Sequence, residues 1–146
     1  MPVRRFFTQE QEQAIIKAIQ EAETNTSGEI RVHIEGQSKK DTFKRAVEVF
    51  EELGMHATDL RNGVLFYLAT EDHKFTILGD KGINESVPEG FWDNIRDVMG
   101  RKFQSGDFTS GLTEGIFMAG KALSEFFPFQ DDDENELPDQ ISTSDQ

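Results

Sequence analysis

The amino-acid sequence predicts an α/β fold, a three-layer α/β/α sandwich in which helices cover both faces of a mixed sheet. Helical and strand-like hydrophobic patterns alternate along the first 127 residues. Two strand-like segments flank a helical one, which predicts a right-handed βαβ crossover with parallel strands. A third strand follows after a three-residue turn, which predicts a β-hairpin. One domain of this kind is the expectation for a chain of 146 residues.

The first helix and the first strand are predicted from their periodicity. Residues 8–24 carry apolar side chains at helical spacing, and Thr8 with Gln11 three residues later matches a capping box. Residues 29–35 (EIRVHIE) alternate between apolar and polar side chains, which predicts a strand with one strongly apolar face. We expect His33, on the other face, to be a solvated surface histidine.

The next segments complete the crossover and the hairpin. Residues 38–54 predict a helix that Asp41 caps and Gly54 ends. Residues 63–70 (GVLFYLAT) are apolar on both faces, which predicts a central strand. After the short connection EDH, residues 74–80 return as its antiparallel partner.

Two further helices are predicted after the hairpin. The first spans residues 88–103, with Pro88 in its first turn, where the missing amide hydrogen is harmless. The second spans residues 107–127 and ends at Pro128.

The C-terminal segment differs in composition from the rest of the chain. Residues 130–146 contain seven acidic side chains and no basic one, so of the net charge of −13 only −6 belongs to residues 1–129. Since this segment has few apolar side chains, burial cannot offset the entropy lost on ordering. We therefore expect a folded domain over residues 1–129 and a disordered acidic tail over residues 130–146.

Composition excludes several classes of function. The net charge of −13 argues against nucleic-acid binding, which requires clustered Lys and Arg. The absence of cysteine excludes disulfides, thiolate nucleophiles and Cys-based zinc sites. No apolar stretch is long enough for a secretory signal or a membrane span. The sequence predicts a soluble, cytoplasmic protein that is not inserted in a membrane.

Polar side chains flank the predicted strands at one end of the sheet. Two parallel strands begin at the same edge, and the antiparallel partner of one ends there. Glu29, Asp59, Asn62, Asp80 and Asn84 are therefore expected to converge. Crowded carboxylates repel one another unless a cation neutralises them, and hard oxygen ligands suit Ca²⁺ or Mg²⁺. The alternative is ordinary turn chemistry, because Asp and Asn are common turn residues.

Glu114 is an additional candidate ligand for the metal. It lies within the last predicted helix among small residues (GLTEG), where a charge is unusual if that face packs inward.

Three segments of the sequence, taken in order, resemble the TPM domain, a family named for a thylakoid lumen phosphatase, a photosystem-associated protein and a worm receptor modulator. They are TNTSGEIRVHI, DLRNGVLFYLATEDHKFTILGDKGINESVP and FQSGDFTSGLTEGI. The resemblance covers residues 8–125 and implies an α/β/α sandwich. It also implies a divalent-cation site, generally for calcium, in acidic loops at one end of the sheet.

Carried over to this chain, that site comprises Glu29, Asp59, Asn62 and Asp80. The family's frequent G-Y-G loop reads GDKG here, so Asp80 stands where an aromatic side chain often lies. This substitution either adds a ligand or shifts the site. Many relatives also have a signal peptide and a membrane segment after the domain, whereas this chain has an acidic tail.

These features lead to three functional hypotheses. The first is a calcium- or magnesium-binding module that acts as a scaffold or interaction domain. The second, which the resemblance to plant members described as acid phosphatases also suggests, is a metal-assisted phosphatase that uses the same carboxylates, with Arg61 and Lys81 as the nearby cations. The third is a protein-binding domain that contacts its partner through the acidic tail or through Phe126, Phe127 and Phe129.

Overall fold

The structure, a computed structural model, describes residues 6–58, 60–128 and 141–144. Its helices and strands follow one another in the order that the hydrophobic patterns predict, with three additions, η2, α3 and β4. The elements are α1 (Gln9–Glu23), β1 (Glu29–Glu35), α2 (Thr42–Glu52), the 3₁₀ helix η2 (Met55–Ala57), β2 (Gly63–Ala69), β3 (Lys74–Gly79), α3 (Lys81–Ser86), α4 (Phe91–Gln104), α5 (Phe108–Phe126) and β4 (Ser142–Ser144).

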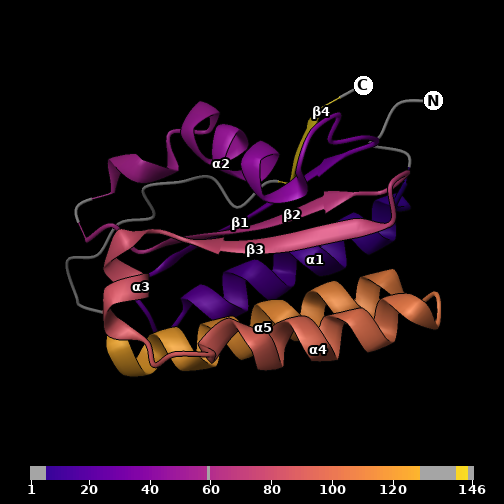
Figure 1. Ribbon diagram of the computed structural model, residues 1–146. Helices are drawn as coiled ribbons and strands as arrows, with labels where there is room; N and C mark the ends of the chain where they lie inside the picture. The colour runs from indigo at the N-terminus through magenta and orange to yellow at the C-terminus, as the bar shows by residue number, and fades with distance from the viewer. Residues whose placement is uncertain (1–5, 59, 129–140, 145–146) are drawn as a thin grey trace.

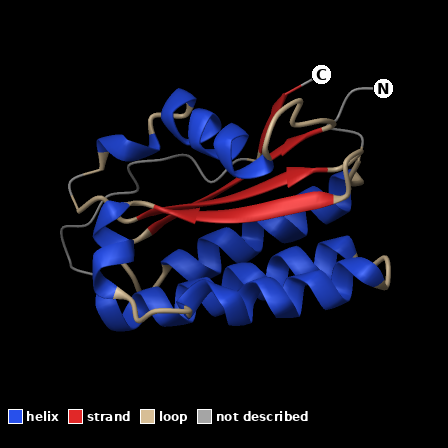
Figure 2. Ribbon diagram, viewed as in Figure 1, coloured by secondary structure: helices blue, strands red, loops and turns tan. Residues whose placement is uncertain are grey.

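The sheet has the strand order β3-β2-β1-β4. β1 and β2 are parallel neighbours joined through α2, and β3 pairs antiparallel with β2, so the crossover unit and the hairpin are both present. Helix α2 lies on one face of the sheet, and α1, α4 and α5 cover the other (Figure 1). The three layers are equally plain when the elements are coloured by type (Figure 2). The predicted fold class is confirmed.

The larger apolar core lies between the sheet and the layer of α1, α4 and α5. Alternate side chains of β1 and β2, such as Val32 and Phe66, are fully buried in it. A smaller core on the other face packs α2 and η2 against Leu65 and Tyr67 of β2. Because β2 is buried on both faces, its continuous apolar sequence is explained. No helix in the described part of the chain is sufficiently long and apolar to cross a bilayer.

Two boundaries differ from the sequence prediction. The glycine-rich GDKGIN loop forms the short helix α3, whose N-cap is Asp80. Helix α4 begins at Phe91 instead of Pro88, because Gly90 adopts the left-handed conformation (φ 80°) and breaks the backbone just before it. Pro88 therefore lies in the connection between the two helices, and the prediction that it occupies a first helical turn is wrong.

Within residues 130–146, for which the sequence predicts a disordered tail, the structure describes residues 141–144. Ser142–Ser144 form β4, which pairs in parallel with residues 33–35 of β1. The unpaired edge of β1 offers backbone donors and acceptors that a short polar strand can satisfy without an apolar face of its own. Residues 129–140 and 145–146 of the predicted tail lie outside the described residues.

Candidate functional site

Three strand ends meet at the end of the sheet near α3, as the topology predicts. Glu29 is the register partner of Gly63 across β1 and β2. On the other side of Gly63, the Asp80 amide donates a hydrogen bond of 2.9 Å to the Gly63 carbonyl. Glu29, Gly63 and Asp80 therefore form one row across the sheet, and their side-chain positions share the face that α2 covers.

Asp80 is a buried carboxylate held by a cation and a helix start. Its oxygens accept hydrogen bonds from Arg61 Nε (2.8 Å) and from a terminal guanidinium nitrogen of Arg61 (2.9 Å). The Lys81 amide, at the start of α3, also donates to it (2.7 Å). Only 5% of the Asp80 side chain is exposed, whereas 45% of the Arg61 side chain is exposed. These bonds raise the pKa of Arg61.

The loop before β2 packs tightly against the first turn of α3. The Gly82 amide donates to the Arg61 carbonyl at 2.8 Å. A Cβ atom on Gly82 would lie only 2.1 Å from the Leu60 carbonyl oxygen, so this approach requires glycine. Arg61 itself has a left-handed backbone (φ 51°), which is uncommon for a residue with a side chain.

Asn62 lies in the same loop and ties it to the start of β1. Its side-chain amide donates to the Ser27 backbone carbonyl at 3.2 Å, and its backbone carbonyl accepts from the Glu29 backbone amide at 3.2 Å. Only 2% of Asn62 is exposed. Two of the predicted ligands thus adjoin Arg61: Asn62 follows it directly in the chain, and Asp80 accepts its hydrogen bonds.

Met55 separates Glu29 from Asp80. Both acids flank Gly63, but the space above Gly63 is filled by Met55, whose side-chain and carbonyl atoms lie 3.4 Å from where a Cβ would stand. Within the described residues, no group of three or more His, Cys, Asp or Glu side chains is arranged to hold a metal ion. The donor set supplies hard oxygens, but Asp80 would have to exchange Arg61 for the ion.

The remaining predicted residues are placed as follows. Asp59 lies outside the described residues. The structure does not bring Glu114 to this end: it is exposed on α5, and its neighbour Gly115 packs beneath Phe66, in the middle of β2. The Asn84 side chain turns away, donating to the Gly79 carbonyl and accepting from the indole of Trp92 (3.3 Å).

A hollow of about 430 Å³ lies beside Asp80 on the α2 side of the sheet. Its polar lining comprises Glu51, His56, Arg61 and Asp80, and its apolar part includes Phe50. The exposed side of the Arg61–Asp80 pair therefore borders a space that is open to small ions.

The structure also contains a buried polar network that the sequence analysis missed. Glu35 is fully buried and accepts hydrogen bonds from Arg45 Nε (2.7 Å) and a terminal Arg45 nitrogen (2.9 Å). The Tyr67 hydroxyl and His33 Nε2 donate to the same carboxylate. On its other side, His33 Nδ1 lies 2.9 Å from the Ser142 hydroxyl, so that the network reaches β4.

The prediction that His33 is a solvated surface residue is therefore wrong. Helix α2 covers this face of β1, the Ser142 side chain of the neighbouring strand β4 contacts His33, and only 3% of His33 is exposed. Burial lowers the pKa of His33 despite its contact with Glu35. Burial alone would raise the pKa of Glu35, but the hydrogen bonds from Arg45, Tyr67 and His33 together hold it below its ordinary value. Burial and the bond to Glu35 raise the pKa of Tyr67.

The comparisons with known proteins identify the family. A family model described as the TPM domain matches residues 3–122. The chain is similar to the BA42 protein from the psychrophilic bacterium Bizionia argentinensis, with 52% identity, a TM-score of 0.90, and coverage of 95% of this chain and 96% of that one. No curated protein matches it.

Two more distant structures share the fold. One is the N-terminal domain of a protein from P. gingivalis, with 19% identity, a TM-score of 0.67, and coverage of 83% of this chain and 78% of that one. The other is the N-terminal domain of the cg2496 protein from Corynebacterium glutamicum, with 12% identity, a TM-score of 0.65, and coverage of 97% and 82%.

Proposed function

The chain belongs to the TPM-domain family, and we propose that it is a divalent-cation-binding module whose ion takes the place of Arg61 beside Asp80. The observation that carries the proposal is the asymmetry of this ion pair. The Asp80 side chain is 5% exposed, while its counter-charge, the Arg61 side chain, is 45% exposed. A buried carboxylate needs a neighbouring positive charge. A half-exposed arginine can move fully into water at little cost in free energy, because its guanidinium is already partly hydrated.

The ligands would come from the loops at this end of the sheet. Asp80 would supply a carboxylate, Asn62 an amide oxygen, and the backbone of the loop before β2 carbonyl oxygens. Asp59 in that loop is the second carboxylate that we expect. Calcium suits such a set better than magnesium, because it accepts more protein oxygens in irregular geometry. When bound, the ion would fix the loop before β2 against α3. The role that we assign to the ion is therefore structural.

Glu29 and Glu114 have smaller parts in this proposal. Met55 stands between Glu29 and Asp80, so Glu29 contributes charge without direct contact unless Met55 moves. Glu114 lies on the exposed face of α5 and is expected to make no contribution.

Calorimetry of calcium binding to the metal-stripped protein tests the proposal. We expect one saturable site in the wild type, a rise in melting temperature with added calcium, and loss of both in Asp80→Asn. The asparagine still caps α3, so the fold should persist. Glu71→Gln, in the turn at the opposite end of the sheet, is the matched control and should bind as the wild type does. No heat in the wild type would refute the proposal.

A metal-assisted phosphatase is the second candidate, favoured by the position of cationic Arg61 on the hollow beside Asp80. Hydrolysis of p-nitrophenyl phosphate with added calcium or magnesium tests it. The binding-module proposal predicts no turnover above the background of the Asp80→Asn variant. Turnover that disappears in this variant would establish the phosphatase instead.

A further inference from the structure

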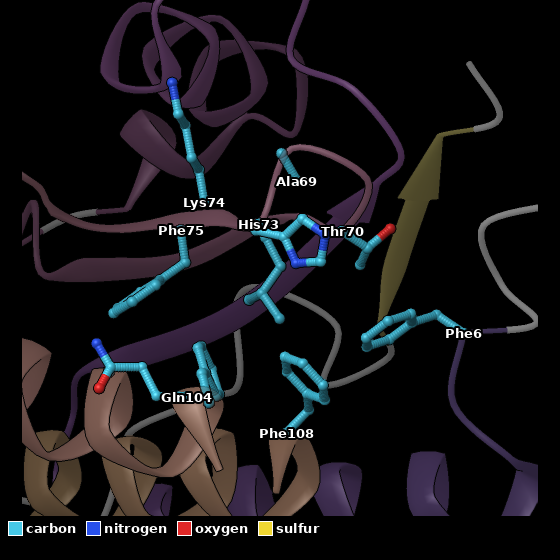
Figure 3. Close-up of a pocket in the computed structure, with 11 residues that line it drawn as sticks. Phe6, Ala69, Thr70, His73, Lys74, Phe75, Gln104 and Phe108 are labelled. Carbon is cyan, nitrogen blue, oxygen red and sulfur yellow. The ribbon is translucent and has the colours of Figure 1, made fainter. Parts of the chain in front are cut away.

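A second cavity lies at the opposite end of the sheet, between the β2–β3 turn and the layer of α1, α4 and α5. Its volume is about 360 Å³, within the range of roughly 300–1,000 Å³ that is usual for small-molecule sites. Figure 3 shows Phe6, Phe75 and Phe108 around this space, with the His73 ring directed over it from the turn.

Four phenylalanine rings form a continuous aromatic wall. The ring centroids of Phe6 and Phe108 lie 5.3 Å apart, those of Phe103 and Phe108 lie 5.4 Å apart, and those of Phe75 and Phe103 lie 4.9 Å apart. Two of these pairs are edge-to-face, an arrangement that leaves ring faces and edges available to a further aromatic ring. The wall therefore suits a flat apolar group.

Because Gly100 has no side chain, it leaves space in the cavity. It lines the cavity from the middle of α4, where glycine disfavours the helix. A Cβ atom there would have no neighbour within 4 Å among the described residues. By contrast, a Cβ on Gly115 of α5 would lie 2.5 Å from Met99 Sδ, so that glycine is required by packing. Packing within the chain gives no such reason for Gly100.

The polar part of the cavity lining is free of acids. None of the eleven described residues that line it is acidic, although the chain has 28 Asp and Glu and a net charge of −13. The two acids of the adjoining turn face elsewhere: Asp72 accepts hydrogen bonds from Ser38, and the Glu71 carboxylate lies against Gly36.

The lining side chains with cationic or hydrogen-bonding nitrogen are His73, Lys74 and Gln104. His73 is directed over the cavity, whereas the exposed Lys74 side chain points away and would have to turn to reach it (Figure 3). His73 also has a left-handed backbone (φ 55°), and this turn conformation carries its ring to the cavity mouth. In an acidic protein, a lining without acids tolerates an anion at this position.

We propose that this cavity binds a small aryl carboxylate, with the aromatic ring between Gly100 and the phenylalanine wall and the carboxylate beside His73. The aromatic wall selects the ring, the space at Gly100 accommodates it, and the acid-free lining tolerates the negative charge. This site is separate from the proposed cation site, which lies at the other end of the sheet.

An amide-shift titration with 3-phenylpropionate tests the proposal. We expect saturable shifts around Thr70, Phe75 and Gln104. The uncharged analogue 3-phenylpropan-1-ol should bind about two- to fivefold more weakly, the range expected for loss of a partly exposed charge contact. His73→Asn retains a residue that tolerates the left-handed backbone, and should weaken binding of the acid. His56→Asn, beside Asp80, is the matched control and should not.

Gly100→Leu supplies the sharpest variant. Filling the cavity should abolish saturable binding and raise the melting temperature, because leucine favours the helix and its Cβ would have no neighbour within 4 Å in the described part of the chain. Gly100→Ala, a smaller change, should also raise the melting temperature and weaken binding less. The proposal fails if wild type gives no saturable shifts at millimolar ligand, if shifts gather around Asp80 instead, if the alcohol binds as tightly as the acid, or if both Gly100 variants bind normally.

Discussion

Glu35 and Asp80 are both buried carboxylates that accept two hydrogen bonds from one arginine, but their surroundings differ. Around Glu35 the arginine is itself nearly buried, with 13% of the Arg45 side chain exposed, and Tyr67 and His33 complete the contacts. Around Asp80 the partner arginine is 45% exposed and borders a hollow.

This difference separates a structural ion pair from an exchangeable one. If Arg45 left Glu35, the fully buried Glu35 carboxylate would lose its counter-charge. The pair therefore fixes α2 on the sheet. Arg61 can leave Asp80 for water, and a metal ion can take over the neutralisation. The same pair of residue types thus serves stability at one site and, in our proposal, binding at the other.

The largest expected effect comes from removing the charge of Glu35. Glu35→Gln removes the buried carboxylate partner of Arg45, which among the described residues keeps only the more exposed Glu48 and Glu52, and we expect a loss of about 3–5 kcal/mol in the free energy of unfolding. Asp80→Asn should cost much less, because Arg61 is free to reach water. Urea denaturation of the two variants measures this difference. Equal losses would abolish the distinction between the two pairs.

The hydroxyl of Tyr67 should have the next largest effect. Tyr67→Phe removes one hydrogen bond to the buried Glu35 carboxylate, and we expect a loss of about 1–3 kcal/mol in stability. In a Glu35→Gln background, Tyr67→Phe should cause a smaller loss of stability, because the two groups are coupled. A double-mutant cycle by urea denaturation checks this. Strictly additive losses would show that Tyr67 stabilises the core only by packing.

The pH dependence of stability should also show the Glu35 network. Burial lowers the pKa of His33 below its ordinary value of 6.5, so the unfolded chain binds the proton before the folded protein does. Stability is therefore expected to fall as the pH decreases from about 7. The pKa of Glu35 is also lowered, so its contribution is retained above its unfolded value and lost as the pH falls through its folded one.

His33→Gln isolates the first of these two contributions. Glutamine keeps a donor and an acceptor but does not titrate, so the decrease in stability between about pH 7 and pH 5.5 should become shallower. Thermal melts across this range measure it. A wild-type slope that the substitution leaves unchanged would place the responsible group elsewhere.

Much of the fold follows from sequence periodicity, and so does the convergence of strand ends. The alternation in EIRVHIE and the continuous apolar run in GVLFYLAT are strong because each reflects the burial of a whole strand. The common position of Glu29 and Asp80 then follows from parallel and antiparallel pairing alone, without knowledge of any side-chain contact.

The Glu35 network could not be predicted in this way. Polar residues that alternate along a strand have the same pattern whether water or a polar layer covers them, and two partners of Glu35, Arg45 and Tyr67, come from α2 and β2. A signal was present in the single tyrosine within the apolar β2 sequence, since a buried hydroxyl needs a partner. The sequence places Arg61 near the predicted site, but its direct bond to Asp80 could not be predicted for a similar reason: the two residues lie 19 positions apart.

Calcium titration of Arg61→Met against the wild type tests the central claim most directly. Methionine removes the competing cation and adds no oxygen ligand. If the ion replaces Arg61 at Asp80, calcium should bind the variant about two- to fivefold more tightly than the wild type, with amide shifts centred on Asp80 and Asn62 in both. Weaker binding in the variant, or shifts that leave these two amides unmoved, would contradict the exchange of arginine for a metal ion.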